Sequence, residues 1–372
     1  MVMKKKILII ASEFPPGSGG IGNHAYQLAL HFYQEHFDVK VVADVIDIDR
    51  KKITDFANTI PFQAILIKRQ RNILKTYFKR IFSSLSSAKD CDIIFCSGKF
   101  SIWLILLLKL KFNSKKIISI VHGTELDLKN SILKKLFFAA LKKSDSIIAV
   151  SNYTKSFIPQ IILNKIPSTI IPNGINIDEF HLQPNKIESF NPLQLITIGT
   201  VSERKGQENL INALPDILKV YPNTFYHIVG KPLMKARLLE LAQSLNISDK
   251  IIFHRMIERN ELIKILDQST IKIMLSNHTS QGDFEGFGIA ILEANAMGKP
   301  AIGSNFSGIT DAIKNNFNGI LVDPKNSQSV VEAITEILNN YSTYSNQSLQ
   351  WAQQHDWKII IKKYIEVLNS VQ

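Results

Sequence analysis

The sequence predicts an α/β protein made of two doubly wound halves, and two observations indicate this. Short runs rich in Ile and Val alternate with segments of helical periodicity over residues 6–150, and the alternation begins again after residue 190. Such alternation is typical of parallel sheets covered by helices on both faces. Because open parallel sheets bind ligands beyond the carboxyl ends of their strands, we expect a ligand cleft between the two halves.

Apolar runs mark the expected strands of both halves. Those of the first half are residues 6–12, 39–46, 64–67, 93–96, 117–122 and 146–150. Those of the second half are residues 193–199, 224–229, 250–253, 271–275 and 300–303. Apolar residues recur at helical spacing at 21–32, 207–221 and 234–244.

A stretch with little periodicity separates the two halves. Residues 177–191 include Asp178, Pro184 and Asn185, and we interpret them as a linker. The predicted domains are therefore residues 1–185 and residues 186–354.

Charge is distributed unevenly along the chain. The formal net charge is +12, and residues 1–185 hold 26 Lys and Arg against 14 Asp and Glu, whereas the remaining residues hold 18 of each. An excess confined to the first half predicts an anionic partner there: a membrane surface, a phosphorylated acceptor or nucleic acid. The two cysteines are too few for a disulfide framework.

The apolar runs also bear on localisation. Only four apolar residues, Ile7–Ile10, follow the N-terminal lysines, which is too short for a signal peptide. The longest apolar stretch, Ile102–Leu108, is far shorter than the ~20 residues that cross a bilayer. We therefore expect a cytoplasmic protein without a membrane-spanning segment.

A glycine-rich loop joins the first expected strand to the first expected helix. Gly19 and Gly20 lie just before that helix, where backbone N–H groups and the helix dipole favour an anion. An ordinary tight turn is the alternative interpretation.

The same loop fits the dinucleotide-binding fingerprint through Gly17, Gly19 and Gly22, with Asp44 as its ribose ligand. However, the segment Glu13–Pro16 separates the strand from the first glycine, and its two prolines do not fit the tight turn of that fingerprint. This disfavours nicotinamide or flavin binding.

A second candidate anion site follows the strand expected at residues 193–199. Arg204 and Lys205 lie at its carboxyl end, where they would face the cleft and neutralise a diphosphate. Taken alone, an Arg-Lys pair in a loop is more often solvated charge.

The segment 284–300 carries two carboxylates eight residues apart. Gly286 and Gly288 place Glu285 in a loop, whereas Glu293 falls within an otherwise apolar helix. A carboxylate in such a helix needs hydrogen-bond donors, which ribose or sugar hydroxyls supply. A neighbouring cation such as Lys299 is the alternative partner.

Two further polar features of the sequence are a histidine at a strand end and a pair of aspartates. His122 ends the strand expected at 117–122, at the edge that faces the cleft, although a lone His at a strand end is usually an ordinary loop residue. Asp47 and Asp49 form a D-x-D pair in a polar loop without neighbouring His or clustered acids. We therefore expect no metal site.

Together these motifs resemble the GT-B-fold retaining glycosyltransferases of family 4. The resemblance covers the whole chain in the family's order, and the combination of Lys205 with Glu285 and Glu293 is its specific part. It implies two Rossmann-like domains with an interdomain cleft and a C-terminal helix, at about 355–372, that crosses back to the first domain. The matching motifs are Gly17–Gly22, His122, Ile171–Ile175, Arg204–Gly206, Glu285-x7-Glu293 and Asn315–Pro324.

The resemblance also implies roles for individual residues. Lys205 contacts the donor diphosphate, Glu293 the nucleotide ribose and Glu285 the transferred sugar, while His122 lies beside the reacting sugar. The implied catalytic residues are His122, Lys205 and Glu285. The implied donor-binding residues are Gly19, Gly20, Arg204, Lys205, Glu285, Gly286, Phe287, Gly288 and Glu293.

The implied activity is retaining hexosyl transfer from a UDP- or GDP-linked sugar to a saccharide or lipid-linked acceptor, without metal or other cofactor. The implied setting is the biosynthesis of cell-surface polysaccharide or lipopolysaccharide. The chain departs from the family at one position, because Thr200 stands where the family often has an Arg, five residues before Lys205. Either Arg204 supplies the missing charge or the site tolerates one cation fewer.

Three other functions stay open on the sequence. A sugar-nucleotide epimerase on the same fold would share most of these residues. A nicotinamide-dependent oxidoreductase depends on the dinucleotide fingerprint, and a nucleic-acid binder depends on charge alone.

The segment Lys68–Arg80 predicts contact with an anionic membrane at the inner face of the cell membrane. Residues 56–88 contain no acidic residue, and the segment supplies six cations. In the alternative interpretation the helix is solvated and its apolar stripe packs on its own sheet. Read as a helix, the segment has a basic stripe of Lys68, Arg71, Lys75 and Lys79 and an apolar stripe of Leu74, Phe78, Ile81 and Leu85.

Overall fold

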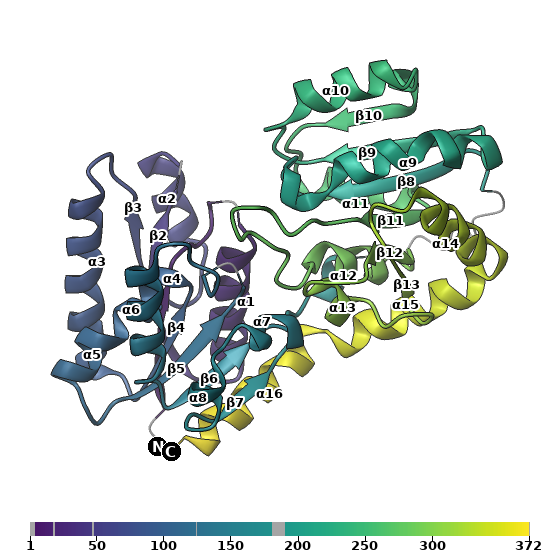
Figure 1. The fold of residues 1–372 in the computed structure, drawn as a ribbon. Helices are drawn as coiled ribbons and strands as arrows, with labels where there is room; N and C mark the ends of the chain where they lie inside the picture. Colours follow the sequence, from purple (N-terminus) through teal and green to yellow (C-terminus); the bar gives the residue numbers. More distant parts are fainter. Residues whose placement is uncertain (1–3, 18, 47, 124, 181–189, 372) are drawn as a thin grey trace. The chain divides into compact units, whose positions relative to one another are not determined.

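The computed structural model describes residues 4–17, 19–46, 48–123, 125–180 and 190–371. They form two compact units: unit 1 comprises Met1–Asn173 with Trp357–Gln372, and unit 2 comprises Gly174–Asp356. Figure 1 shows that each unit contains one sheet with helices packed on it. The boundary expected between residues 185 and 186 lies within 181–189, outside the described residues.

The sheet of unit 1 has seven strands in the order β3-β2-β1-β4-β5-β6-β7, and every neighbouring pair is parallel. Ile9 of β1, for example, is aligned with Val41 on one side and with Phe95 on the other. These strands are almost wholly apolar because helices cover both faces of the sheet. The strands are β1 Lys6–Ala11, β2 Asp38–Val45, β3 Gln63–Lys68, β4 Ile93–Ser97, β5 Lys116–Val121, β6 Ser146–Ala149 and β7 Ser168–Ile170.

The helices of unit 1 come from both ends of its sequence. Helix α16 follows unit 2 in the sequence, yet it packs against α1. The hydroxyl of Tyr364 lies 2.8 Å from Nε2 of His24, and Trp357 stacks on His31. The helices are α1 Gly20–Gln34, α2 Arg50–Ala57, α3 Ile73–Ser87, α4 Lys99–Trp103, α5 Ile105–Lys111, α6 Ser131–Leu141, α7 Asn152–Ser156, α8 Gln160–Leu163 and α16 Trp357–Ser370, with a 3₁₀ turn η1 at Ala88–Asp90.

The sheet of unit 2 has six strands in the order β10-β9-β8-β11-β12-β13, again all parallel. Two doubly wound parallel sheets confirm the predicted fold class. The strands are β8 Leu193–Ile198, β9 Thr224–Val229, β10 Ile251–His254, β11 Ile271–Met274, β12 Ala301–Ser304 and β13 Gly319–Val322.

Helices α9, α10 and α14 cover one face of this sheet and form a core with Leu195, Tyr226, Ile271 and Ile273. The helices of unit 2 are α9 Gln207–Val220, α10 Lys235–Ser244, α11 Arg259–Gln268, α12 Ile289–Ala296, α13 Ile309–Ala312, α14 Ser327–Asn339 and α15 Tyr341–Gln354. Three 3₁₀ turns accompany them: η2 Ile177–Glu179, η3 Glu203–Lys205 and η4 Ser248–Lys250.

Both sheets reverse their strand order at one point. The reversal lies between β1 and β4 in unit 1 and between β8 and β11 in unit 2. At such a point the loops that leave the two central strands diverge to opposite faces, which opens a crevice for ligands. In unit 2 these loops carry Arg204 and Lys205 after β8, and Glu285 after β11.

Helix α3 does not present the basic and apolar stripes in the form expected from the sequence of Lys68–Arg80. The helix begins at Ile73, so Lys68 ends strand β3 instead of lying on the helix. Arg80 is not a surface cation, because its side chain is 1% exposed and forms an ion pair of 2.8 Å with Asp44. Ile81 and Leu85 pack against the core of unit 1.

Candidate active site

In unit 1 the glycine-rich loop leads from β1 directly into α1. Gly20 is the first residue of the helix and Gly19 its N-cap, and no side chain of the described residues caps this end. A side chain at Gly19 would displace Glu13, because its Cβ would lie 2.3 Å from Oε2 of that carboxylate. Burial raises the pKa of Glu13, against a weaker opposing effect of Arg69. No motif in the sequence pointed to Glu13 as a residue of this site.

His122 follows strand β5 and is held on both sides. Its Nε2 lies 2.9 Å from Oγ of Ser97, and its backbone N–H donates to Oε1 of the buried Glu125 at 2.5 Å. The ring of His24 packs edge-to-face on it, with centroids 4.9 Å apart. Burial lowers the pKa of His122 to about 4. The imidazole is therefore neutral at pH 7.

Asp44, considered above as a ribose ligand, is already engaged. One of its oxygens accepts a hydrogen bond of 2.8 Å from Nη1 of Arg80. The other guanidinium nitrogen donates to the carbonyl of Ala11 and to Oγ of Ser101. Asp44 is thus part of a buried network that ties β2 to α3.

In unit 2 a close backbone approach positions Arg204 and Lys205. Gly206 ends η3 in a left-handed conformation, and a Cβ there would lie 1.7 Å from the carbonyl oxygen of Leu275. Only glycine allows this approach. The backbone N–H of Asn277 also donates to the carbonyl of Arg204 at 2.9 Å. The loops after β8 and β11 are therefore tied together.

Three charged side chains meet between these loops. Oε2 of Glu285 lies 2.5 Å from Nη1 of Arg204 and 2.7 Å from Nζ of Lys205. Burial disfavours the ionised carboxylate, but the two cations outweigh it and lower the pKa of Glu285 to about 2. The Lys205 side chain is only 13% exposed, less than expected for a residue open to a cleft.

The residues after Glu285 hold their backbone against helix α13. The N–H of Gly308 donates to the carbonyl of Glu285 at 2.8 Å, and a Cβ on Gly308 would lie 1.9 Å from the carbonyl oxygen of Gly286. Gly288 is the N-cap of α12, with φ of 99°. Phe287 is buried, so its ring packs inside unit 2.

Glu293 lies on α12 and has a cationic partner, although not the one expected from the sequence. Its Oε1 accepts a hydrogen bond of 2.6 Å from Nη1 of Arg259, which also pairs with Glu179. Lys299, the alternative partner, donates instead to the carbonyl of Asp267 at 2.6 Å. The sequence did not indicate Arg259 as the partner of Glu293, because the two residues lie 34 positions apart in the chain.

The described part of the chain contains neither a metal-ligand cluster nor a membrane-spanning helix. No three His, Cys, Asp or Glu residues there are placed to hold a metal ion. No helix there is long and apolar enough to span a membrane. Asp47 lies outside the described residues, and Asp49 caps α2 by accepting the N–H of Lys52.

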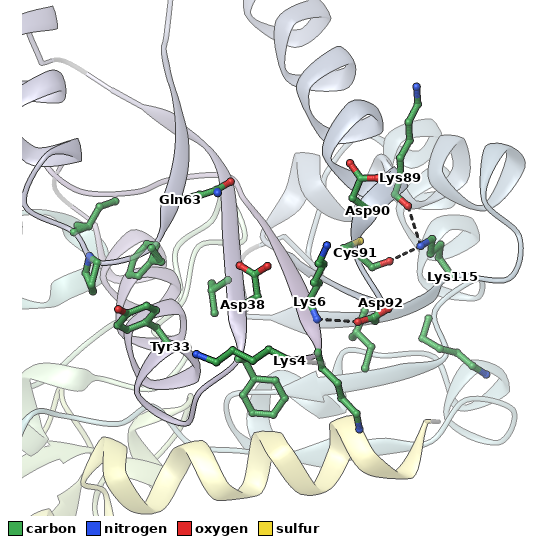
Figure 2. Close-up of a pocket in the computed structure, with 18 residues that line it drawn as sticks. Lys4, Lys6, Tyr33, Asp38, Gln63, Lys89, Asp90, Cys91, Asp92 and Lys115 are labelled. Carbon is green, nitrogen blue, oxygen red and sulfur yellow. Dashed lines mark hydrogen bonds between the residues drawn. The ribbon is translucent and has the colours of Figure 1, made fainter. Parts of the chain in front are cut away.

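A separate hollow of about 1210 Å³ lies at the amino ends of the strands of unit 1 (Figure 2). Lysines and aspartates line it, and several are engaged with backbone: Lys115 donates to the carbonyls of Lys89 and Cys91, and Asp92 accepts the N–H of Lys6. Gly19 and His122 lie at the opposite, carboxyl edge of the sheet. The hollow is therefore separate from the candidate site.

Two doubly wound parallel sheets, with polar and charged loops at the carboxyl ends of their central strands, define the GT-B class of α/β proteins. Residues 179–354 match the family described as glycosyl transferases group 1, and residues 18–179 match glycosyltransferase family 4. The two matches together cover residues 18–354. The chain is therefore a glycosyltransferase that belongs to family 4, group 1.

Individual relatives agree with this assignment. An uncharacterized glycosyltransferase of Methanocaldococcus jannaschii is 25% identical, with 99% of both chains covered. A GDP-mannose-dependent alpha-(1-6)-phosphatidylinositol monomannoside mannosyltransferase of Mycolicibacterium smegmatis is 22% identical, with 89% of both chains covered. Among solved structures, Anabaena HepE in complex with UDP and glucose superimposes with a TM-score of 0.78 at 16% identity, covering 98% of this chain and 100% of that one.

Proposed function

We propose that this glycosyltransferase moves a hexose from a UDP- or GDP-linked donor to a saccharide or lipid-linked acceptor, with retention and without a divalent metal. The observation that carries the proposal is the pair of cations, Arg204 and Lys205, on one oxygen of Glu285 at the switch point of unit 2. Related proteins support the donor class, since one uses GDP-mannose and another was solved with UDP and glucose.

The proposed donor site uses the charges of unit 2. A diphosphate is more anionic than one carboxylate, so it competes with Glu285 for Arg204 and Lys205. The freed carboxylate of Glu285 then accepts hydrogen bonds from the transferred sugar, together with the backbone of Gly286–Gly288. Glu293, oriented by Arg259, accepts from the ribose hydroxyls. Arg204 thereby supplies the cation that Thr200 does not.

Charge on the leaving group is the main stabilisation in the proposed reaction. The bond between the anomeric carbon and the phosphate oxygen breaks, and the acceptor oxygen bonds to the same face of that carbon. The acceptor's proton passes to the leaving phosphate oxygen, so no protein base is needed. Lys205 and Arg204 stabilise the diphosphate as its charge develops. We assign neutral His122 a hydrogen-bonding role beside the reacting sugar, and Gly19 and Gly20 a role at the diphosphate.

Nucleotide release from a panel of UDP-, GDP- and ADP-sugars tests the donor class. We expect release from one UDP- or GDP-sugar that is accelerated by acceptor, with the anomeric configuration kept when the product is followed by NMR. An inverted product would contradict the retaining mechanism, and release of an epimerised nucleotide sugar without acceptor would favour an epimerase.

We further propose that the enzyme works in the cytoplasm at the inner membrane face, in polysaccharide or lipopolysaccharide biosynthesis. Leu74, Phe78 and Phe82 of α3 are 71%, 73% and 68% exposed, and their four-residue spacing places them on one face of the helix. Lys75 and Lys79 beside them are also exposed. An exposed apolar stripe flanked by cations suits an anionic bilayer, which accepts both.

A further inference from the structure

Strand β11 carries a lysine inside the sheet of unit 2. Lys272 is 0% exposed, and its Nζ has no hydrogen-bond partner among the described residues. On the neighbouring strands its register partners are Ile196 and Ala301. A buried amine without a partner is costly, and such a group needs an explanation.

The alternation of the strand shows which way Lys272 faces. Ile271 and Ile273, on either side, belong to the core beneath α9, α10 and α14. Lys272 therefore lies on the other face, together with Met274. The sulfur of Met274 lies against Gly288, 3.1 Å from where a Cβ would be, at the start of α12. Lys272 thus faces the side of the sheet where the candidate donor site lies.

The charges around Lys272 are those of the candidate donor site. Burial lowers the pKa of its amine well below the ordinary value, and Lys205 on η3 adds to this. Glu293 on α12 and Glu285 in the preceding loop act in the opposite direction. Both carboxylates have other cationic partners, Arg259 for Glu293 and Arg204 with Lys205 for Glu285. The carboxylates that could serve as counter-ions of the Lys272 amine are therefore already paired with other cations.

We propose that Lys272 is a reserve cation of the donor site: when an anionic donor draws Arg204 and Lys205 away from Glu285, the Lys272 amine binds one proton from solvent and neutralises that carboxylate. The inference rests on the proposed donor site. A buried carboxylate that loses both partners is strongly destabilised. A nearby neutral amine removes that cost by becoming an ammonium ion, so donor binding is coupled to proton uptake.

Calorimetry of nucleotide binding tests the inference. UDP, GDP and ADP are titrated separately into the full-length enzyme at pH 8, in two buffers of different ionisation enthalpy, which gives the protons bound per nucleotide. We expect the wild type to take up about one proton more than Lys272→Met, whose side chain has a similar length and no charge. The variant should also bind about tenfold more weakly, equivalent to ~1.4 kcal/mol.

Controls separate the possible outcomes. Lys299→Met removes another buried lysine of unit 2, one that donates to a backbone carbonyl, and should leave the proton count unchanged. Lys272→Gln keeps a polar group that cannot titrate and should match Lys272→Met. If Lys272→Met keeps the wild-type proton uptake, the proton goes elsewhere and the role of Lys272 is wrong. If the wild type binds none of the three nucleotides, the donor site itself is wrong, and the role of Lys272 with it.

Discussion

Arg204 and Lys205 share a single oxygen of Glu285, at 2.5 Å and 2.7 Å. Two adjacent residues of one loop thus converge on a carboxylate that is 81 residues beyond Arg204 in the chain. Under the proposed function, this carboxylate occupies the place that the anionic donor takes when it binds. The three side chains together carry one net positive charge, and under the proposed function a donor diphosphate competes with Glu285 for both cations.

Replacing Lys205 with Ala should lower turnover by about 10²–10³-fold, because one preorganised charge at the leaving group is lost. Arg204 keeps Glu285 paired, so the fold should persist. Steady-state rates with saturating donor measure the effect, with Lys325→Ala, an exposed lysine of the same unit, as the matched control. Near-normal turnover in a folded Lys205→Ala enzyme would contradict the assignment.

The two substitutions Glu293→Ala and Glu293→Gln should affect donor binding differently. The amide of Gln keeps an oxygen that accepts from ribose hydroxyls, whereas Ala keeps none. We expect Glu293→Ala to bind the donor more weakly than Glu293→Gln in calorimetric titrations. Both variants remove the ion pair between Arg259 and Glu293 but leave that between Arg259 and Glu179, so Arg259→Met serves as the control for loss of the first pair. Equal affinities in wild type and both Glu293 variants would leave Glu293 a structural carboxylate.

Exhaustive chelation should leave turnover unchanged. The proposed site stabilises the diphosphate with Arg204, Lys205 and backbone N–H groups instead of a divalent ion. Rates are compared before and after treatment with EDTA, and again after Mg²⁺ or Mn²⁺ is added back. An activity that disappears with EDTA and returns with either ion would overturn the metal-independent mechanism.

Acid should destabilise the fold through two groups in separate pH ranges. The pKa of His122 in the folded protein, about 4, is below its unfolded value of about 6.5. Its contribution to the free energy of unfolding is therefore fully present above pH 6.5 and is lost as the pH falls towards 4. The pKa of Glu285, about 2, is below its ordinary 4.5, so its contribution is lost only below pH 4.5. Each pKa unit corresponds to about 1.4 kcal/mol.

Urea unfolding of His122→Gln and Glu285→Gln against wild type separates these two ranges. The stability difference between wild type and His122→Gln should narrow between pH 6.5 and pH 4. The difference for Glu285→Gln should stay constant down to pH 4.5. A stability difference between wild type and His122→Gln that stays constant from pH 6.5 to pH 4 would show that the fold does not lower the pKa of this ring.

Vesicle co-sedimentation tests the proposed membrane surface. Binding should require anionic lipid and weaken at high salt, because each cation near the surface contributes about 1 kcal/mol. It should fall when Lys68, Arg71, Lys75 and Lys79 are changed together to Gln, and also when Leu74, Phe78 and Phe82 are changed to Ser. Lys142 and Lys143, exposed lysines elsewhere in unit 1, are the matched charge controls. Binding that does not depend on lipid charge would contradict the proposed membrane surface and make α3 an ordinary surface helix.

Among the strands that the structure describes, the sequence predicted all except β7 and β13, since buried parallel strands are recognisable as apolar runs. It placed His122 and Lys205 at the carboxyl ends of strands, and Glu285 in a loop. It did not predict which side chains would pair. Arg80 looked like a surface cation because helical spacing does not show which face a neighbouring sheet covers, and its partner Asp44 is 36 residues away. Lys272 was hidden within an apolar run and was read only as part of a strand.

The chain order of unit 1 has a consequence for biosynthesis. Unit 2 is complete in sequence at Asp356, whereas unit 1 still lacks α16, whose Tyr364 and Trp357 pack against His24 and His31. The side of α1 that carries His24 and His31 therefore stays uncovered by α16 while 183 further residues are synthesised. The half of the enzyme that is synthesised first is thus the half that matures last, and chaperones have their longest opportunity to bind it there.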